Sequence, residues 1–324
     1  MKPLLASIVV FVSLLIVSAV ASAQPLEFKQ GDHICIIGNA LGDRMQHHGW
    51  LETLLVSRCA DKDLVFRNLA VSGDEITFRH RSENFGSPEE WLTRCKADVI
   101  FAMFGFNESF AGEAGLAKFK ADLDTFIKET LKKNYSGKGP PRLVIFSPLA
   151  VEKLNDPNLP DAAMTNANLK LYAAAMAEVA KANKVPFVDL FSILQKYFNA
   201  PMGGERIPLT FNGIHLTEHG DKVVAPLIEE ALLPTAKLLE HMKALEKLRA
   251  AILEKNKQWH ARYRTVDGYN VYGGRSKESY DSGKGGPKIT NCQMVDAFVH
   301  QRLHRLVRRA NDWLLMHVEA GVED

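Results

Sequence analysis

The stretch that decides the fold is Ile34-Cys35-Ile36-Ile37-Gly38-Asn39-Ala40-Leu41-Gly42-Asp43. An apolar run of strand-forming residues stops at Gly38, and a short polar turn then leads into a helix-like segment. In an open α/β sheet, ligands and catalytic groups gather at the carboxyl ends of the strands. We therefore expect the functional site of this protein to include the turn after this strand.

Short apolar runs alternate with helical patterns through the first two-thirds of the chain, which is typical of a parallel sheet covered on both faces. The predicted strands are His33–Gly38, Leu64–Leu69, Asp98–Gly105, Arg142–Ser147 and Pro186–Leu190. The predicted helices are Trp50–Cys59, Pro88–Lys96, Gly115–Lys133, Ala162–Asn183 and one that begins near an N-cap at Thr217. The pattern predicts a three-layer α/β/α sandwich with a five-stranded parallel sheet and right-handed crossovers.

The composition changes beyond Pro234, where a helical extension is expected. Ala236–Gln258 is a long charged helical pattern with an apolar stripe, and Met294–Val318 is predicted to be a final helix. Between them, the Tyr/Gly-rich segment Tyr263–Arg275 is a candidate cover for a pocket mouth, since it offers aromatic and arginine side chains. The expected organisation is a signal peptide at 1–23, a sheet domain at 24–233 and a helical C-terminal extension at 234–324.

The first residues have the pattern of an export signal. Lys2 precedes an apolar run from about Leu4 to Val20, and Ala21-Ser22-Ala23 fits a small-x-small cleavage site. We expect cleavage there and a periplasmic or extracellular mature protein. The alternative is an uncleaved anchor, because the run is nearly long enough to span a bilayer. No later stretch of the sequence has the length and hydropathy of a membrane span.

Charge and cysteine content exclude several classes of protein. The formal net charge is +2 with neutral histidines, which is too small for a nucleic-acid binder held by phosphate contacts. The four cysteines include no C-x-x-C pair, so neither a zinc knuckle nor a c-type haem attachment site is present. Export permits disulfides, and Cys59 with Cys95 is a conceivable pair that sequence alone does not decide. Neither a cofactor nor a metal is expected.

Four short blocks lie where the predicted strands end or before the last helix of the sheet domain. They are Gly38–Leu41, Asn68–Glu75, Gly105–Ser109 and Asn212–Thr217. In this order they resemble the blocks of the SGNH (GDSL) hydrolases, and the resemblance covers roughly Gln30 to Leu233. It implies a flavodoxin-like sandwich with a serine nucleophile, a histidine base three residues after an aspartate, and an oxyanion hole of backbone and asparagine N–H groups. The chain looks most like a bacterial exported subgroup.

Carried over position by position, the resemblance assigns Gly73 and Asn107 to the oxyanion hole and His215 to the base. The nucleophile position is Ala40 and the aspartate position is Asn212. Alanine has no group that attacks an ester, and an Asp-to-Asn change in such a triad alone lowers kcat by about 10⁴. The leading interpretation is a degenerate esterase, a pseudoenzyme that binds a small ester- or sugar-bearing molecule.

Two alternatives stay open. The first is an active esterase or carbohydrate deacetylase, in which His215 activates water or a relocated serine, Ser72 or Ser109, supplies the nucleophile. The second is a scaffold that docks a protein partner through the C-terminal helices.

Two pairs of histidines are candidate metal ligands. His47 and His48 come just before the predicted helix at Trp50, where a solvated or rim position is favoured over a ligand role. His300 and His304 lie four residues apart on a helix, but no carboxylate or cysteine completes a set at a recognisable spacing. A solvated helix face is therefore the favoured interpretation of the second pair.

Overall fold

The computed structural model describes residues 26–82, 85–154, 156–200, 207–234, 242–264, 277–280, 288–290, 293 and 296–319. The predicted signal peptide lies outside these residues, and so does the Tyr/Gly-rich segment beyond Arg264. None of the described helices combines the length and the hydropathy that a membrane span needs.

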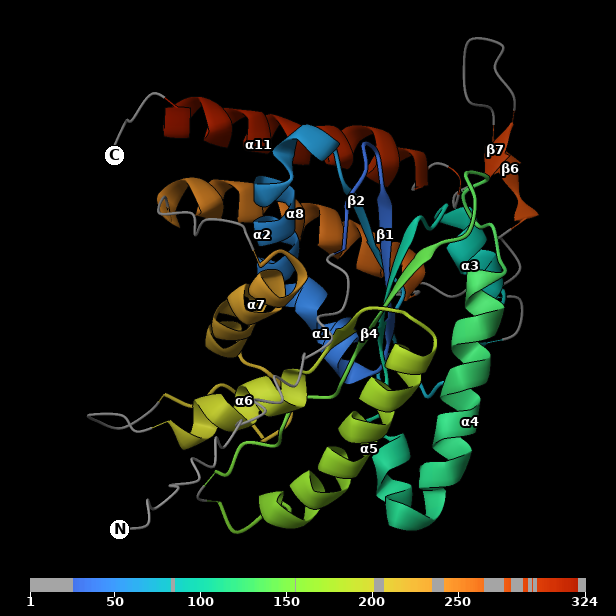
Figure 1. The fold of residues 1–324 in the computed structure, drawn as a ribbon. Helices are drawn as coiled ribbons and strands as arrows, with labels where there is room; N and C mark the ends of the chain where they lie inside the picture. Colours follow the sequence, from blue (N-terminus) through green and yellow to red (C-terminus); the bar gives the residue numbers. More distant parts are fainter. Residues whose placement is uncertain are drawn as a thin grey trace, which may run out of the picture.

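Five parallel strands form one sheet in the order β2-β1-β3-β4-β5 (Figure 1). They are β1 (His33–Gly38), β2 (Val65–Asn68), β3 (Val99–Met103), β4 (Arg142–Phe146) and β5 (Phe187–Val188). All five predicted strands are thus confirmed. The chain runs outward from β1 to β2 and then returns to the other side of β1, so the strand order reverses between β1 and β3. Ligands bind outside the carboxyl ends of the strands at such a switch point.

Helices cover both faces of the sheet because β1 is apolar on both sides: Ile34 and Ile36 pack into one core cluster, and Cys35 and Ile37 into the other. One face carries α1 (Ala40–His48), α2 (Trp50–Arg58), α6 (Leu190–Asn199) and α7 (Glu218–Leu232) (Figure 1). The other carries α3 (Pro88–Arg94), α4 (Gly112–Leu131) and α5 (Ala162–Ala182). The predicted α/β/α sandwich is confirmed.

Local capping explains where several helices begin. The Thr217 hydroxyl accepts a hydrogen bond from Gly220 N at 3.0 Å, so the predicted N-cap of α7 is present. Asp189 caps α6, a helix that the sequence analysis did not anticipate, by accepting from Ser192 N at 3.0 Å. Gly49, with φ of 71°, ends α1 directly before α2. His47 and His48 therefore belong to the last turn of α1.

The long helices of the described C-terminal extension pack against the sheet domain. The described extension contains α8 (Met242–Tyr263), the short antiparallel strands β6 (Ser279–Tyr280) and β7 (Ile289–Thr290), a π-helical turn (Phe298–Leu303) and α11 (His304–Glu319). Leu245, Leu248 and Ile252 of the predicted stripe are buried in the same core cluster as α2 and α7. In Figure 1, α8 and α11 lie together beyond β2.

The cysteines of the described chain are free thiols, so the conceivable Cys59–Cys95 disulfide is not formed. Cys95 instead lies beside Cys35 of β1, and a hydrogen bond between the two side chains, together with burial, holds the pKa of the Cys35 thiol well above its usual range. Both behave as small core residues. Cys292 lies outside the described residues.

Candidate functional site

The turn after β1 is built by close backbone packing. Gly38 has φ of 132°, and a Cβ at this position would lie 2.1 Å from the carbonyl oxygen of Met103 in β3. Only glycine fits this approach. The next residue, Asn39, donates its backbone N–H to the same oxygen at 3.0 Å, and its Oδ1 accepts from Leu41 N at 3.4 Å as the cap of α1. Ala40 is thereby held as the first residue of α1, at the sheet's switch point.

Ala40 and His215 line the same pocket. The pocket is lined by residues from α1, from the turns after β3 and β4, and from the turn before α7: Asn39, Ala40, Leu41, Arg44, Met45, His48, Phe106, Pro148, Leu149, Ala150, Val151, Ile214, His215, Leu216 and Asp221. Its cavity measures about 30 Å³, which is room for one or two water molecules. A wider hollow of about 240 Å³ adjoins it and shares Phe106, Val151 and Ile214 with it.

The two residues assigned to an oxyanion hole lie near each other but do not line this pocket. The Asn107 side-chain amide donates to the backbone oxygen of Asp74, the residue after Gly73, at 3.3 Å. Gly73 is exposed, with φ of 92°. In this conformation the Asn107 amide is therefore directed to the backbone of the loop after β2 rather than to the space beside Ala40.

Asn212 and His215 are in direct contact, and the contact determines which ring nitrogen carries the proton. Asn212 Oδ1 accepts from the backbone N–H groups of His215 at 2.9 Å and of Ile214 at 3.2 Å. The Asn212 NH₂ group must then face His215 Nδ1, which lies 2.9 Å away. Because Nδ1 accepts this hydrogen bond, the neutral imidazole carries its proton on Nε2. A triad base needs the opposite tautomer, with a free lone pair on Nε2.

The surroundings of His215 favour its neutral form. Burial lowers the pKa of the imidazole, and the positive charge of Arg44 lowers it further. Phe211 stacks on the ring with 5.6 Å between centroids, and the Arg44 guanidinium lies 4.8 Å from the Phe211 centroid. Among the described residues, no carboxylate pairs with His215. At neutral pH the residue is therefore a hydrogen-bond donor through Nε2.

The two serines considered as relocated nucleophiles are engaged elsewhere. Ser72 Oγ donates to Asp43 Oδ2 at 2.7 Å. Ser109 Oγ donates to the carbonyl oxygen of Phe106 at 2.6 Å, and the residue is buried. Neither serine lines the pocket of Ala40, and neither hydrogen-bonds to His215. The geometry gives no support to a relocated serine nucleophile.

Two pocket residues escaped the sequence analysis, Arg44 and Asp221, and a third, His48, was considered there only as a solvated or rim residue. Asp221 is fully buried in the first turn of α7, and burial raises the pKa of its carboxyl to about 7. Its Oδ2 accepts from Trp50 N at 3.4 Å. Within the described chain, Asp221 Oδ1, Arg44 Nε and His48 Nε2 are buried without a partner. An acidic residue in a first helical turn is so common that its sequence position carries no signal.

The two histidine pairs differ in the structure: His47 and His48 face different sides of α1, whereas the rings of His300 and His304 stack with 6.4 Å between centroids. His48 lines the pocket, whereas His47 is exposed and faces α8. His300 Nδ1 lies 3.5 Å from Arg67 Nη2, and His304 Nε2 lies 3.3 Å from Asp63 Oδ1. Burial lowers the pKa of His304 to about 4, so this contact joins a carboxylate to a neutral imidazole. In the described residues, His300 and His304 belong to no group of three metal-ligand side chains.

A five-stranded parallel sheet in this order, covered by helices on both faces, defines a doubly wound α/β/α sandwich of the flavodoxin-like type. Residues 37–223 match the GDSL-like lipase/acylhydrolase family, and the chain belongs to that family. No curated protein matches the chain.

Solved structures with a similar fold include a gut microbial diltiazem-metabolizing enzyme, at 18% identity and a TM-score of 0.50, over 65% of this chain and 49% of that one. The chain thus spans about half the length of that enzyme. An acetyl xylan esterase is similar at 16% identity and a TM-score of 0.46, over 62% of this chain and 100% of its own. The aryl esterase of M. smegmatis is similar at 15% identity and a TM-score of 0.43, over 62% and 100%. At such identities, similarity bears on the fold alone.

Proposed function

We propose that this protein is an exported, catalytically degenerate member of its family that binds a small ester- or sugar-bearing molecule without cleaving it. The observation that carries the proposal is the 2.9 Å contact between the Asn212 amide and His215 Nδ1. It makes Nε2 of His215 a donor, beside a position where Ala40 offers no nucleophile.

The expected losses of catalytic rate support ligand binding over ester hydrolysis. Alanine at the nucleophile position closes the covalent route, whatever the base does. The wrong histidine tautomer costs about 10⁴ in kcat in a triad that still has its serine. Water activation by His215 has the same difficulty, because the nitrogen that would take the proton from water already carries one. The water-based esterase alternative therefore finds no support in this geometry.

The pocket's chemistry suggests what it holds. Three groups offer hydrogen-bond donors among apolar walls: His215 through Nε2, Arg44 through Nε and Asn39 through Nδ2, the last two without a partner in the described chain. Buried donors of this kind require acceptors, and an ester carbonyl or a carboxylate supplies them. The narrow cavity would take no more than an acetyl-sized group, and the adjoining hollow lined by Phe110, Leu159 and Asn212 would take the rest of the molecule.

The scaffold alternative has less support. The described apolar residues Leu303, Val307 and Ala310 of the C-terminal helices are buried in the same core clusters as the sheet domain. Of the described apolar residues of α11, Leu306 is 42% exposed, so only a small part of this described face is left for a partner. Partner docking through these helices remains a prediction.

Hydrolysis of short acyl nitrophenyl esters and acetylated sugars tests the proposal in wild type and in His215→Ala. We expect no turnover above the His215→Ala background. In parallel, thermal shift measures the binding of short-chain esters, acetylated sugars and the corresponding acids. This binding should be weaker in His215→Ala than in wild type. Turnover that is well above background and lost in His215→Ala would overturn the pseudoenzyme assignment.

A further inference from the structure

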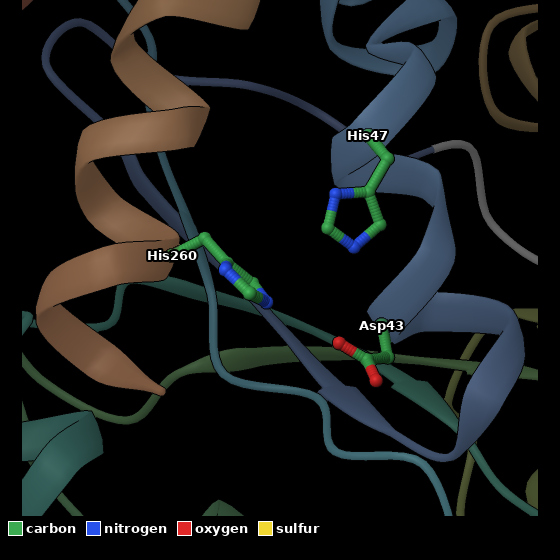
Figure 2. Close-up of side chains that lie close together, drawn as sticks. All are labelled: Asp43, His47 and His260. Carbon is green, nitrogen blue, oxygen red and sulfur yellow. The ribbon is translucent and has the colours of Figure 1, made fainter. Parts of the chain in front are cut away.

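A second cluster of chemically reactive side chains lies on a neighbouring face of α1. Asp43 and His47 are four residues apart on this helix, so they share one face, whereas Arg44 and His48 are turned toward the pocket. His260 comes from α8, far along the chain. Figure 2 shows all three side chains directed toward a common space between the two helices. Their ligand atoms all lie within 4.8 Å of one another.

Two imidazoles and one carboxylate form a set that binds divalent transition metals. Each neutral imidazole offers one nitrogen lone pair to an ion. Within the described chain, neither ring has a hydrogen-bond partner. The rings are arranged edge to face, with 5.0 Å between centroids. Such an arrangement leaves their nitrogens free to converge on an ion.

The carboxylate is oriented by its neighbours, as metal-binding carboxylates are. Asp43 Oδ2 accepts from Ser72 N at 3.1 Å and from Ser72 Oγ at 2.7 Å. Its Oδ1 accepts from the Gln46 side chain at 3.2 Å, and this oxygen retains a lone pair for an ion. Asp43 therefore joins the histidine cluster to the loop after β2 that contains Gly73.

The three ligand side chains must move slightly closer together to bind an ion. Two ligand atoms at about 2.1 Å from a tetrahedral zinc ion are about 3.4 Å apart. The ligand atoms of this cluster lie within 4.8 Å of one another, so their separations must shorten when an ion binds. His47 is exposed and can change its side-chain rotamer without disturbing the core. Asp43 and His260 approach from elements already packed on each other, since α1 and α8 are in contact. A rotation of His47 is therefore the main adjustment that an ion would need.

One positive charge competes for the site. Arg264 directly follows α8, and its Nη2 lies 3.4 Å from Asp43 Oδ2. An ion bound here would repel this guanidinium and displace it from the carboxylate. The Arg264 guanidinium thus competes with the ion for the Asp43 carboxylate, and removal of its charge should strengthen metal binding.

We propose that Asp43, His47 and His260 form a binding site for a divalent transition metal such as Zn²⁺, with an open coordination position toward solvent. The bound ion fastens α8 of the C-terminal extension to α1 of the sheet domain. Through the Asp43–Ser72 contact, it also orders the loop that carries Gly73. This proposal is independent of the proposed ligand pocket, since none of the three residues lines it.

The test uses the full chain, stripped of metal with a chelator and then dialysed. Addition of Zn²⁺ or Co²⁺ should raise Tm with increasing concentration, because an ion that binds only the folded state stabilises it. Mg²⁺ and Ca²⁺, which prefer oxygen ligands, should have little effect. Co²⁺ bound by two nitrogens should also give visible absorption bands, which report the site at a temperature where every variant is folded.

Variants locate the site. His47→Ala and His260→Ala should each weaken Co²⁺ binding by about tenfold or more, and Arg264→Gln should strengthen it. His219→Ala, which removes an exposed histidine of α7, is the matched control and should bind like wild type. Because His47 is exposed, His47→Ala should fold normally. Absence of any response in wild type, or unchanged Co²⁺ binding by His47→Ala and His260→Ala, would refute the proposal.

Discussion

The side-chain amide of Asn212 lies 2.9 Å from Nδ1 of His215, and Asn212 Oδ1 is held by two backbone N–H groups. The amide therefore donates to the ring, and the ring proton sits on Nε2. In a triad with an aspartate, the same two positions place the proton on Nδ1. One amide in place of one carboxylate thus converts the histidine from a base into a donor.

The tautomer is directly measurable. In ¹⁵N NMR spectra at neutral pH, His215 should show a protonated Nε2 and an unprotonated Nδ1. In Asn212→Asp the proton should move to Nδ1, and the pKa of His215 should rise, because a carboxylate replaces an amide beside it. Arg44 and burial, which lower the pKa in the natural chain, remain as before. A wild-type protein with its proton on Nδ1 would contradict the assignment.

A serine at position 40 together with an aspartate at position 212 should produce ester hydrolysis. Ala40→Ser with Asn212→Asp should hydrolyse short acyl nitrophenyl esters at least about 10³-fold faster than Ala40→Ser alone, since the tautomer term in a triad is about 10⁴. The increase should disappear when His215→Ala is added to the double variant. An inert but folded double variant would contradict this prediction and would fit the present contact of the Asn107 amide with Asp74 O, which directs that donor away from Ala40.

Asp221 should make the protein less stable as the pH rises toward neutrality. Its folded-state pKa of about 7 lies above the ordinary value of 3.8, so the folded protein holds this proton more tightly than the unfolded chain. Its contribution to the free energy of unfolding therefore falls as pH rises from about 4 to about 7. Each pKa unit is worth about 1.4 kcal/mol, so the change is at most about 4 kcal/mol.

Asp221→Asn removes this titration while keeping an acceptor for Trp50 N. The variant should gain stability relative to wild type at pH 8 and lose that advantage at pH 4, as measured by urea unfolding at both pH values. Glu218→Gln, which alters an exposed carboxylate in the same turn, is the control and should show a much smaller pH dependence. A constant difference between wild type and Asp221→Asn would argue against a raised pKa.

The buried pair Lys255 and Glu52 should be essential to the attachment of α8. Lys255 Nζ lies 2.5 Å from Glu52 Oε1, with side-chain exposures of 2% and 10%. Glu52→Gln leaves the ammonium group buried without a counter-charge, which typically costs about 3–5 kcal/mol. Lys255→Met combined with Glu52→Gln should recover most of this loss. Chemical denaturation measures the free energy of unfolding of both variants. A double variant no more stable than Glu52→Gln would show that the unpaired ammonium group is not the cause of the loss.

Gly38 should tolerate no side chain. In Gly38→Ala the new methyl group would meet Met103 O at 2.1 Å, at φ of 132°. We expect a loss of about 3 kcal/mol or more, from overpacking and backbone strain together. Gly137→Ala is the control, because it too has positive φ, 81°, but nothing within 4 Å of its Cβ. It should cost only about 1–2 kcal/mol. Equal losses in the two variants would exclude the close approach as the cause.

Much of the site could be predicted because it depends on local patterns at the ends of strands. Ala40 and His215 were placed together from the turns that hold them, and Asn212 from its spacing of three residues to the histidine. Arg44 and Asp221 were missed, and His48 was not assigned to the pocket, since their convergence depends on the angle at which α1 and α7 pack. His260 was missed for the same reason, because only the docking of α8 brings it to Asp43 and His47.

The sequence by itself determined the five-stranded sheet, the family and the presence of alanine at position 40, since the apolar pattern and the identity of each residue are properties of the chain alone. The tertiary structure decided the direction of the Asn212–His215 hydrogen bond, the narrowness of the pocket and the meeting of Asp43, His47 and His260. These depend on distances between segments far apart in the chain. Packing of helices across the sheet sets such distances, and no local pattern encodes them.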